Sequence, residues 1–524
     1  MTAIPLFDRI SDYVPYHAAR HGERDCMVQD DRRWSYARLA AEVDAFARAL
    51  LDAGVQKGDR VAFLSTPRPE AFLAFLATAS IGGIMLGLNP KFPPGELGYF
   101  VGDAEPRLLL GFASDAEGEH AGVLRSLGAG SASVGRVVVL GTGEGCTSWE
   151  AWLAEGSKVS SEALASVRAE VEAGDPCLLV YTSGTTGRPK GALLSHRGIT
   201  YCSVVQAGRW APEPLRGICN LPVNHIGFMG DMSSYALVAG GTMFHMEKFD
   251  PHGMLALIES EHLTVWGQVP TMFALALAQP DFEKFDLSSL RWIIWGGSRA
   301  PREMIEALRR TSPGVVVATS FGMTETTGSV TYTQPDDDIE TLSETVGRPD
   351  PHFEVRIARP DGTPVEPGEE GEILVRGSHI MLGYWRRPEA TAAAIDAQGW
   401  LHTSDVALLR PDGNHALRGR MSEMYKSGGE NVYPREVEQV LEAHPAVALS
   451  AVFGIPDPLF GEVGLAYVIR RPGTDPKEEE LRAFCREHLV NFKLPKRIVI
   501  AEMLPMLPIG KIDKVALRRA SQLR

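Results

Sequence analysis

The segment from Tyr181 to Gly191, YTSGTTGRPKG, holds the residue types that bind a phosphate chain. It packs hydroxyl side chains, three glycines and Lys190 into eleven residues, directly after an apolar run. Glycines let the backbone approach a phosphate closely, hydroxyls donate hydrogen bonds, and a lysine supplies positive charge. The segment therefore predicts a nucleotide-phosphate site with contacts from Thr182, Ser183, Gly184, Thr185, Thr186, Gly187 and Lys190.

The position of the lysine separates this loop from the Walker A motif. In Walker A, glycine precedes the lysine and Ser or Thr follows it. Here Lys190 follows Pro189 and precedes Gly191. A P-loop kinase or GTPase is therefore disfavoured, and an ordinary Ser/Thr/Gly surface loop is the remaining alternative.

Further segments follow the loop in a fixed order and decide between these interpretations. They are Ser320–Glu325 (SFGMTE), Gly371–Gly377 (GEILVRG), Trp400–Asp405 (WLHTSD), Gly419-Arg420, Ser427–Glu438 (SGGENVYPREVE) and Leu507–Lys511 (LPIGK). Together they resemble the motifs of the adenylate-forming superfamily, which comprises acyl-CoA synthetases, peptide-synthetase adenylation domains and beetle luciferases. The resemblance covers essentially the whole chain and is strongest to the acyl-CoA synthetase branch.

The resemblance implies an α/β fold with a large N-terminal domain and a small, mobile α+β C-terminal domain. The large domain, residues 1–420, would contain two α/β subdomains and a β-barrel, the nucleotide site and the acyl pocket. The small domain, residues 421–524, would carry the catalytic lysine and a loop that lines the CoA tunnel.

The chemistry of such an enzyme gives the matched residues their roles. ATP first converts a carboxylate to an acyl-adenylate, and a thiol then displaces AMP. Negative charge gathers at phosphorus in the first transition state, where preorganised cations and donors stabilise it. By resemblance, Glu325 and Thr182 hold Mg²⁺ and Thr324 binds the α-phosphate. Lys511 would bridge the substrate carboxylate and the α-phosphate as a point charge.

The nucleoside and CoA contacts are also implied by resemblance. Phe321 would stack on adenine, and Asp405 would accept the ribose hydroxyls with help from Arg420. The other implied contacts are Gly297, Ser298, Arg299, Ser320, Gly322, Met323, Lys426, Ser427, Gly428, Gly429 and Glu430. His225 is placed at the mouth of the acyl pocket, with a hydrogen-bonded core histidine as the alternative.

Four positions depart from the family pattern. Ser404 stands where glycine usually precedes the ribose-binding Asp, and Phe321 replaces the commoner tyrosine. Asn224 replaces an aromatic residue before His225, and Glu423 stands where Asp or Lys usually serves as the hinge. None of these changes removes a charge that the mechanism needs.

The sequence leaves alternatives open for the acyl acceptor and for the carboxylic acid. The Ser427–Asn431 loop resembles that of free-standing acyl-CoA synthetases, so CoA is the expected acceptor; loading of a carrier protein is the alternative. A catalytically silent relative is disfavoured because Lys511, Glu325 and Asp405 are all present. The expected partners are ATP, CoA and a small-molecule carboxylic acid, and a homodimer is left open.

The acyl pocket is expected to be largely apolar. Its segments are residues 225–235, 266–273, 296–299, 323 and 328–331. A fatty or other hydrophobic acid is therefore expected, with an aryl or alicyclic acid as the alternative. An α-amino acid is disfavoured because Ile226-Gly227 occupies the place of the amine-binding Asp of amino-acid-activating relatives.

The elements that must position these residues follow an alternating pattern. Helical patterns over residues 39–53 and 70–80 alternate with apolar runs at 60–64, 83–88, 177–181, 263–266, 292–295 and 315–319. Such alternation predicts parallel sheets covered by helices. A hairpin is expected near residues 406–419, and helices over 434–443 and 477–489.

Composition narrows the class of protein further. The chain has 524 residues, and 52 Lys and Arg against 66 Asp and Glu give a net charge of −14. An acidic surface argues against general nucleic-acid binding. Six scattered cysteines, no apolar leader and a Gly-broken apolar stretch at 71–88 predict a soluble, cytoplasmic protein with no disulfide scaffold and no membrane span.

Overall fold

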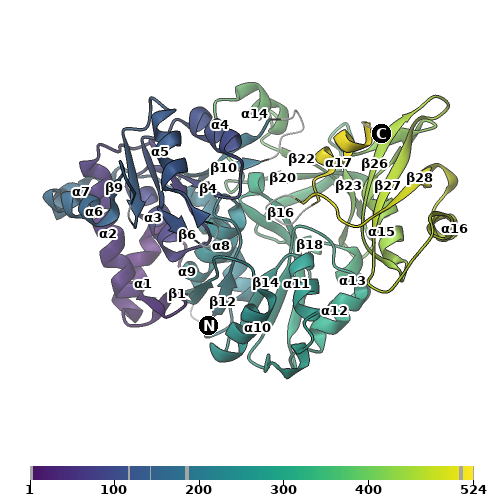
Figure 1. The fold of residues 1–524 in the computed structure, drawn as a ribbon, viewed down its shortest axis with the longest axis horizontal. Helices are drawn as coiled ribbons and strands as arrows, with labels where there is room; N and C mark the ends of the chain where they lie inside the picture. The colour runs from purple at the N-terminus through teal and green to yellow at the C-terminus, as the bar shows by residue number, and fades with distance from the viewer. Residues whose placement is uncertain (1–3, 116–117, 142, 183–187, 507–511, 523–524) are drawn as a thin grey trace. The chain divides into compact units, whose positions relative to one another are not determined.

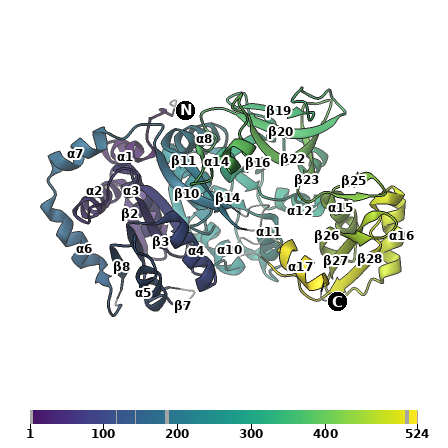
Figure 2. The same ribbon diagram turned by 90° about the horizontal axis from the view of Figure 1, so that it is seen from above.

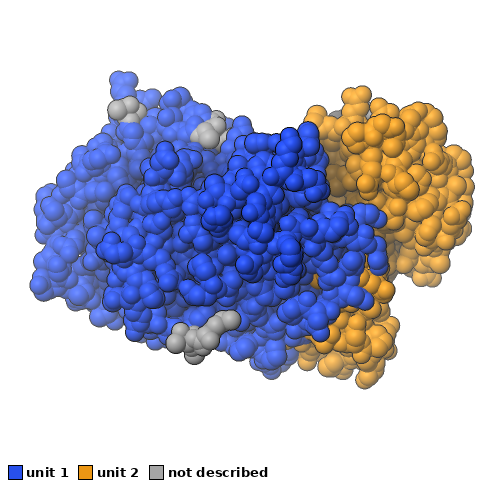
Figure 3. All heavy atoms as spheres, turned by 90° about the horizontal axis from the view of Figure 1, so that it is seen from below, with its two compact units in different colours: residues 1–339, 349–354, 375–401 blue, residues 340–348, 355–374, 402–524 orange. Residues whose placement is uncertain are grey.

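The structure is a computed structural model that describes residues 4–115, 118–141, 143–182, 188–506 and 512–522. The chain divides into two compact units, coloured separately in Figure 3. Unit 1 comprises residues 1–339, 349–354 and 375–401, and unit 2 comprises residues 340–348, 355–374 and 402–524. The predicted boundary near residue 420 lies inside unit 2 and stays a prediction.

One sheet of unit 1 has eight strands in the order β21-β11-β10-β4-β3-β5-β8-β9. Their bounds are Gly383–Tyr384, Lys190–Ser195, Pro176–Thr182, Ile84–Leu88, Arg60–Leu64, Leu108–Phe112, Arg136–Leu140 and Thr147–Ser148. Strands β4, β9 and β10 of this sheet are labelled in Figure 1. The accompanying helices are α2 (Tyr36–Asp52), α3 (Pro69–Ser80), α4 (Pro94–Ala104), α5 (Ala121–Ala129), α6 (Trp149–Glu155), α7 (Ser161–Ala169) and α14 (Pro388–Ala394). A small pair, β6 (Ser114–Asp115) and β7 (Gly118–Glu119), lies outside this sheet.

The apolar stretch over residues 71–88 belongs to the interior of this sheet layer. Every residue of α3 is buried, and β4 follows it as a buried strand. The prediction of a buried helix turning into a core strand is therefore confirmed. Among the described residues, no helix combines the length and the apolar character that crossing a membrane requires.

The other large sheet has nine strands in the order β18-β17-β16-β15-β14-β12-β13-β1-β2. Their bounds are Arg348–Pro349, Gly328–Tyr332, Val316–Met323, Trp292–Trp295, Val265–Gln268, Arg216–Cys219, Thr242–His245, Asp25–Gln29 and Arg32–Ser35. Its helices are α1 (Tyr13–His21), α8 (His196–Trp210), α9 (Tyr235–Ala239), α10 (Pro251–Ser260), α11 (Pro270–Leu277), α12 (Arg302–Arg309) and a π-helix, η3 (Gly227–Ser234). Helix α13 (Ile339–Glu344) follows and belongs almost entirely to unit 2. Strands β12 to β16 pair in parallel, as the alternating pattern predicts.

The region in which a β-barrel was expected forms a four-stranded sheet. Its order is β19-β20-β22-β23, with bounds Glu354–Ala358, Glu370–Arg376, Leu401–Leu409 and His415–Arg420. The last two strands pair antiparallel, which confirms the hairpin predicted near residues 406–419.

The C-terminal part of unit 2 is a five-stranded sheet with helices on both faces (Figure 2). Its strands are β25 (Glu430–Val432), β24 (Tyr425–Ser427), β27 (Gly461–Arg470), β26 (Val447–Asp457) and β28 (Arg497–Ala501), and its helices are α15 (Pro434–Ala443), α16 (Glu478–His488) and α17 (Lys514–Gln522). Successive side chains of a strand face opposite sides of a sheet. Val452 therefore joins the core under α15 and α16, whereas Phe453 joins a second core that contains Leu517 of α17.

Candidate active site

A buried carboxylate occupies the turn that follows β16. Glu325 lies in the short 3-10 helix η5 (Thr324–Thr326), and only 5% of its surface is exposed. Its Oε1 accepts hydrogen bonds from the Thr182 hydroxyl at 3.1 Å and the Tyr384 hydroxyl at 2.9 Å. Two hydroxyl donors offset the cost of burying the carboxylate and fix its orientation.

The strands that flank the predicted phosphate loop form an antiparallel pair. In the register of β10 and β11, Thr182 lies opposite Lys190. The Tyr99 hydroxyl donates to the main-chain oxygen of Pro189 at 2.9 Å and holds the second strand where it begins. Ser183, Gly184, Thr185, Thr186 and Gly187 lie outside the described residues. The two ends of the loop are therefore fixed, and its first strand ends beside Glu325.

Tyr384 is a site residue that sequence reasoning missed. It lies on β21, which pairs with β11, and the Lys190 ammonium sits 4.5 Å from the centre of its ring. One side chain therefore contacts both the predicted metal-binding acid and the predicted phosphate-binding lysine. The only sequence signal is a Gly-Tyr-Trp run, whose aromatic residues are more typical of core packing.

The predicted adenine site lies at the carboxyl ends of two parallel strands. Trp295 of β15 lies opposite Thr319 of β16, and the Thr319 hydroxyl donates to the Trp295 oxygen at 3.0 Å. Gly297 and Ser298 follow the first strand and are exposed, whereas Phe321 is 8% exposed. Ligands of parallel α/β sheets bind at this edge. The remaining predicted contacts here are Arg299, Ser320, Gly322, Met323 and Thr324.

The predicted ribose-binding pair lies in unit 2. Asp405 of β22 and Arg420 of β23 are opposite each other in the hairpin, and Arg420 Nε donates to Asp405 Oδ1 at 3.2 Å. Ser404 before this Asp has φ of 61°, the left-handed region that glycine prefers. The serine therefore keeps the backbone conformation that the usual glycine would adopt without strain.

The predicted CoA loop is a tight hairpin. Lys426 and Ser427 on β24 pair with Asn431 and Glu430 on β25. Gly428 and Gly429 between them both have positive φ, 63° and 92°, which a two-residue hairpin turn of type I′ requires. Lys511 lies outside the described residues.

Comparison with known proteins decides the family. A family model described as AMP-binding enzyme matches residues 14–385, and one described as AMP-binding enzyme C-terminal domain matches residues 436–511. The chain belongs to the AMP-binding enzymes. The prediction of the adenylate-forming superfamily is confirmed.

Relatives place this AMP-binding enzyme in the acyl-CoA synthetase branch. A Mycobacterium tuberculosis 3-[(3aS,4S,7aS)-7a-methyl-1,5-dioxo-octahydro-1H-inden-4-yl]propanoyl:CoA ligase is 35% identical over 526 residues, 99% of this chain and 98% of that protein. A feruloyl-CoA synthase of an Amycolatopsis species is 36% identical over 488 residues, 93% of each chain. The crystal structure of the anthranilate CoA ligase AuaEII with anthranoyl-AMP aligns with a TM-score of 0.88 at 26% identity, over 100% of this chain and 99% of that one.

These matches establish the enzyme class. The protein is an AMP-forming acid–thiol ligase that uses ATP and CoA. The predicted fold class, a mixed α/β chain with a large N-terminal and a small C-terminal domain, is confirmed as well.

His225 of this AMP-binding enzyme is half-buried beside η3. The Gly227 N–H donates to His225 Nδ1 at 3.0 Å, so that ring nitrogen carries a lone pair and not a proton. The ring thus orders the start of the π-helix. Its predicted place at the mouth of the acyl pocket stays a prediction.

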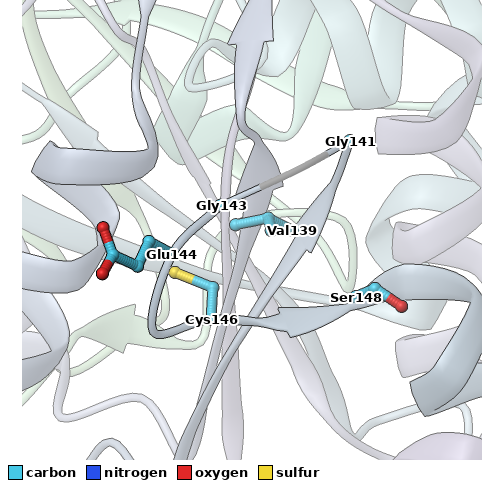
Figure 4. A pocket seen from close by; sticks show the side chains of 6 residues that line it. All are labelled: Val139, Gly141, Gly143, Glu144, Cys146 and Ser148. Carbon is cyan, nitrogen blue, oxygen red and sulfur yellow. The ribbon is translucent and has the colours of Figure 1, made fainter.

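A surface pocket of about 460 Å³ lies near β8 and β9, away from the residues above in the sequence (Figure 4). Its described lining is Val139, Gly141, Gly143, Glu144, Cys146 and Ser148. This lining contains one carboxylate and no cation, so it lacks the charge that ATP or CoA phosphates need. The predicted site residues lie elsewhere in the chain.

Proposed function

We propose that this ligase activates a hydrophobic carboxylic acid and transfers its acyl group to CoA. Ring-bearing acids, aryl or alicyclic, are the first candidates, because two of its relatives are named for an octahydroindenyl propanoyl and a feruloyl group. Straight-chain fatty acids are the second candidate. Phe228, Met229 and Met232 are buried in η3, so the segment predicted to line the acyl pocket is largely apolar, as either kind of acid would require.

The observation that carries the proposal is the position of Glu325 beside the end of the phosphate loop. We assign Glu325 and Thr182 to Mg²⁺, since carboxylate and hydroxyl oxygens suit this ion. Among the residues that the structure describes, no cluster of three or more His, Cys, Asp and Glu side chains could hold a metal alone. When bound, the ion would supply positive charge beside the phosphates of ATP.

The remaining roles follow the order of the two reactions. A carboxylate oxygen attacks the α-phosphorus and pyrophosphate leaves; Lys190, Thr324 and Lys511 stabilise the charge that develops. Asp405 and Arg420 hold the ribose while Phe321 stacks on adenine. The CoA thiol then attacks the acyl carbon and AMP leaves, with the Lys426–Glu430 hairpin lining the path of CoA.

A panel of acids tests this function. Purified enzyme with ATP and Mg²⁺ is assayed for pyrophosphate with aryl, alicyclic and straight-chain acids, and mass spectrometry then follows the acyl group after CoA is added. We expect pyrophosphate with at least one hydrophobic class and a CoA thioester without any carrier protein. Pyrophosphate without a thioester would favour loading of a carrier, and no pyrophosphate with any acid would refute the proposal.

A further inference from the structure

Asp231 introduces a charge into a segment predicted to form the acyl pocket. It is the one charged residue between His225 and Tyr235 in the sequence. It lies in the middle of the π-helix η3, whose neighbouring side chains Phe228, Met229 and Met232 are buried. π-Helical segments are rare and occur frequently at functional sites.

The carboxylate of Asp231 faces the strand that follows the Glu325 turn. A Cβ atom placed on Gly328 would lie 3.0 Å from Asp231 Oδ1 and 3.4 Å from the Cβ of Cys202. The Cys202 thiol donates to the main-chain oxygen of Thr326 at 3.7 Å. The carboxylate therefore lies against Gly328, close to the turn that bears the predicted metal-binding acid, and a side chain at position 328 would crowd it.

The hydrogen-bonding capacity of this carboxylate is unused. Gln206 Nε2 donates to the main-chain oxygen of Asp231 at 3.0 Å, but no group among the described residues donates to its carboxylate oxygens. The side chain is half-buried, so part of its surface is open to a small molecule. Burial raises the pKa of this carboxyl from 3.8 to about 6, and it is ionised at neutral pH.

An unsatisfied carboxylate in apolar surroundings is costly to keep. A structural aspartate would normally be paired, as Asp350 is by Arg209 and His352 in the same unit. We propose that Asp231 recognises the substrate: it accepts a hydrogen bond from a hydroxyl or N–H group on the distal part of the acid. This inference rests on the proposed function and narrows its substrate class to hydrophobic acids that carry a donor group.

The donor group would not be an α-amino group. Amino-acid-activating relatives place their aspartate at the position of Ile226-Gly227, several residues earlier in the chain, and this chain has no acid there. Asp231 therefore accepts a hydrogen bond from a group further along the acid, such as a ring hydroxyl, a ring amine or a hydroxyl at the end of a chain.

Matched pairs of acids test the inference on the wild-type enzyme. Each acid that is turned over is compared with its hydroxyl or amino derivative, for example 3-phenylpropanoate with 3-(4-hydroxyphenyl)propanoate and octanoate with 8-hydroxyoctanoate. We expect kcat/KM for pyrophosphate release to be roughly 10- to 100-fold higher for the donor-bearing acid in at least one pair, the range of a hydrogen bond to a charged group. Equal values, or preference for the plain acid in every pair, would overturn the inference.

Variants then assign the preference to Asp231. Asp231→Ala should bring the ratio within each preferred pair close to one, while Asp231→Asn, which keeps an acceptor oxygen without charge, should keep part of it. Asp350→Asn is the matched control, because its carboxylate is already paired; stability should fall and the ratio should not change. A ratio that persists in Asp231→Ala would overturn the inference, and if that variant does not fold, Asp231→Asn and the wild-type pairs decide. If the enzyme is active only on acids without a donor group, the proposed function stands and this inference is refuted. If it is inactive on all acids, both are refuted.

Discussion

The Tyr384 side chain links two groups that the reaction needs at the same place. Its hydroxyl donates to Glu325 and its ring lies beside the Lys190 ammonium. A cation is attracted to the face of an aromatic ring, and a hydroxyl donor holds a carboxylate in one orientation. We therefore expect Tyr384 to act as a positioning residue for Glu325 and Lys190.

Tyr384→Phe removes the hydroxyl and keeps the ring. We expect the Mg²⁺ concentration for half-maximal pyrophosphate release to rise and kcat for adenylation to fall about tenfold, because Glu325 loses one of its two hydroxyl donors. The measurement is a magnesium titration at saturating ATP. Tyr36→Phe is the control: its buried hydroxyl donates to the main-chain oxygen of Gly241, so stability but not magnesium dependence should change. An unchanged titration in Tyr384→Phe would remove it from the site.

The raised pKa of the Asp231 carboxyl also makes the stability of the protein depend on pH. Its pKa is raised by burial to about 6 in the folded state against 3.8 in the unfolded chain, so the folded state binds the proton more tightly. Stability therefore decreases as pH rises from about 4 to 6, and the loss remains at higher pH. Burial also raises the pKa values of Cys202 and Tyr332, which face this carboxyl, well above this window.

Asp231→Asn does not titrate and should escape this loss. We expect the variant to be more stable relative to the wild type at pH 8 than at pH 4.5, with the difference in the free energy of unfolding (variant minus wild type) larger by about 1–3 kcal/mol at pH 8. Urea denaturation at the two pH values measures the difference. Parallel stability curves for the two proteins would mean that the Asp231 carboxyl is solvated in the folded state.

At the scale of elements, local pattern predicted most of the core. Strands at Arg60–Leu64 and Trp292–Trp295 and the helix at Pro434–Ala443 have the predicted bounds, because an apolar run or an amphipathic period is contained in each segment. The π-helix η3 and the pairing of β21 with β11 were not predicted. A π-helix has no strong local signature, and Tyr384 meets Glu325 across 59 residues of sequence.

The residues of the candidate site also divide into those that the sequence predicts and those that it does not. The phosphate loop and Glu325 could be named from the sequence because glycines, hydroxyls and charges are concentrated in short motifs. Asp231 and Tyr384 could not, because an isolated acid and an isolated tyrosine are common in any chain. Only the missing donor around one and the shared contacts of the other single them out.

The turn in β22 before Asp405 carries a strained residue. Ser404 has φ of 61°, and its N–H donates to Glu372 Oε1 at 2.8 Å while its oxygen accepts from the Met421 N–H at 2.8 Å. These two hydrogen bonds hold the backbone in a conformation that costs an L-residue roughly 1 kcal/mol. Ser404→Gly should therefore stabilise the protein by about 0.5–1 kcal/mol.

Chemical denaturation of Ser404→Gly against Ser404→Ala separates strain from side-chain loss. The alanine variant loses the hydroxyl but keeps the Cβ atom, so it should not gain stability. A gain of equal size in both variants would show that the hydroxyl, and not the backbone angle, is the source.

At the scale of the whole molecule, the proposed roles are divided between the two units. Unit 1 contains Thr182, Lys190 and Glu325, and unit 2 contains Asp405 and, by sequence, Lys511. If Lys511 serves only the first reaction, Lys511→Ala should nearly abolish adenylation and largely spare thioester formation from supplied acyl-adenylate. The two half-reactions are assayed separately, by pyrophosphate release and by CoA thioester formation. Equal loss in both would refute the role of Lys511.

A partly buried ion cluster ties the start of α17 to the rest of unit 2. Lys514, at the start of α17, contacts Glu423 Oε2 at 2.7 Å and Glu438 Oε1 at 2.8 Å. Burial alone would lower the pKa of Lys514, but the charges of Glu438 and Glu423 outweigh it and raise the pKa. Glu423 stands at the predicted hinge, so Lys514, three residues after Lys511 in the sequence, joins this hinge position to helix α15.

Lys514→Met should therefore lower the stability of the protein and slow the first half-reaction more than the second. Glu438 keeps Arg435 and the Val452 N–H as partners and the Glu423 side chain is 42% exposed, so we expect the loss of Lys514 to lower the free energy of unfolding by about 1 kcal/mol. Because Lys511 is proposed to act only in adenylation, loosening its segment should slow pyrophosphate release several-fold more than thioester formation from acyl-adenylate. Lys477→Met, which removes an exposed lysine paired with Asp475, is the control and should change neither property. Equal slowing of both half-reactions in a Lys514→Met protein that still folds would mean that the cluster supports unit 2 as a whole and does not position the catalytic lysine.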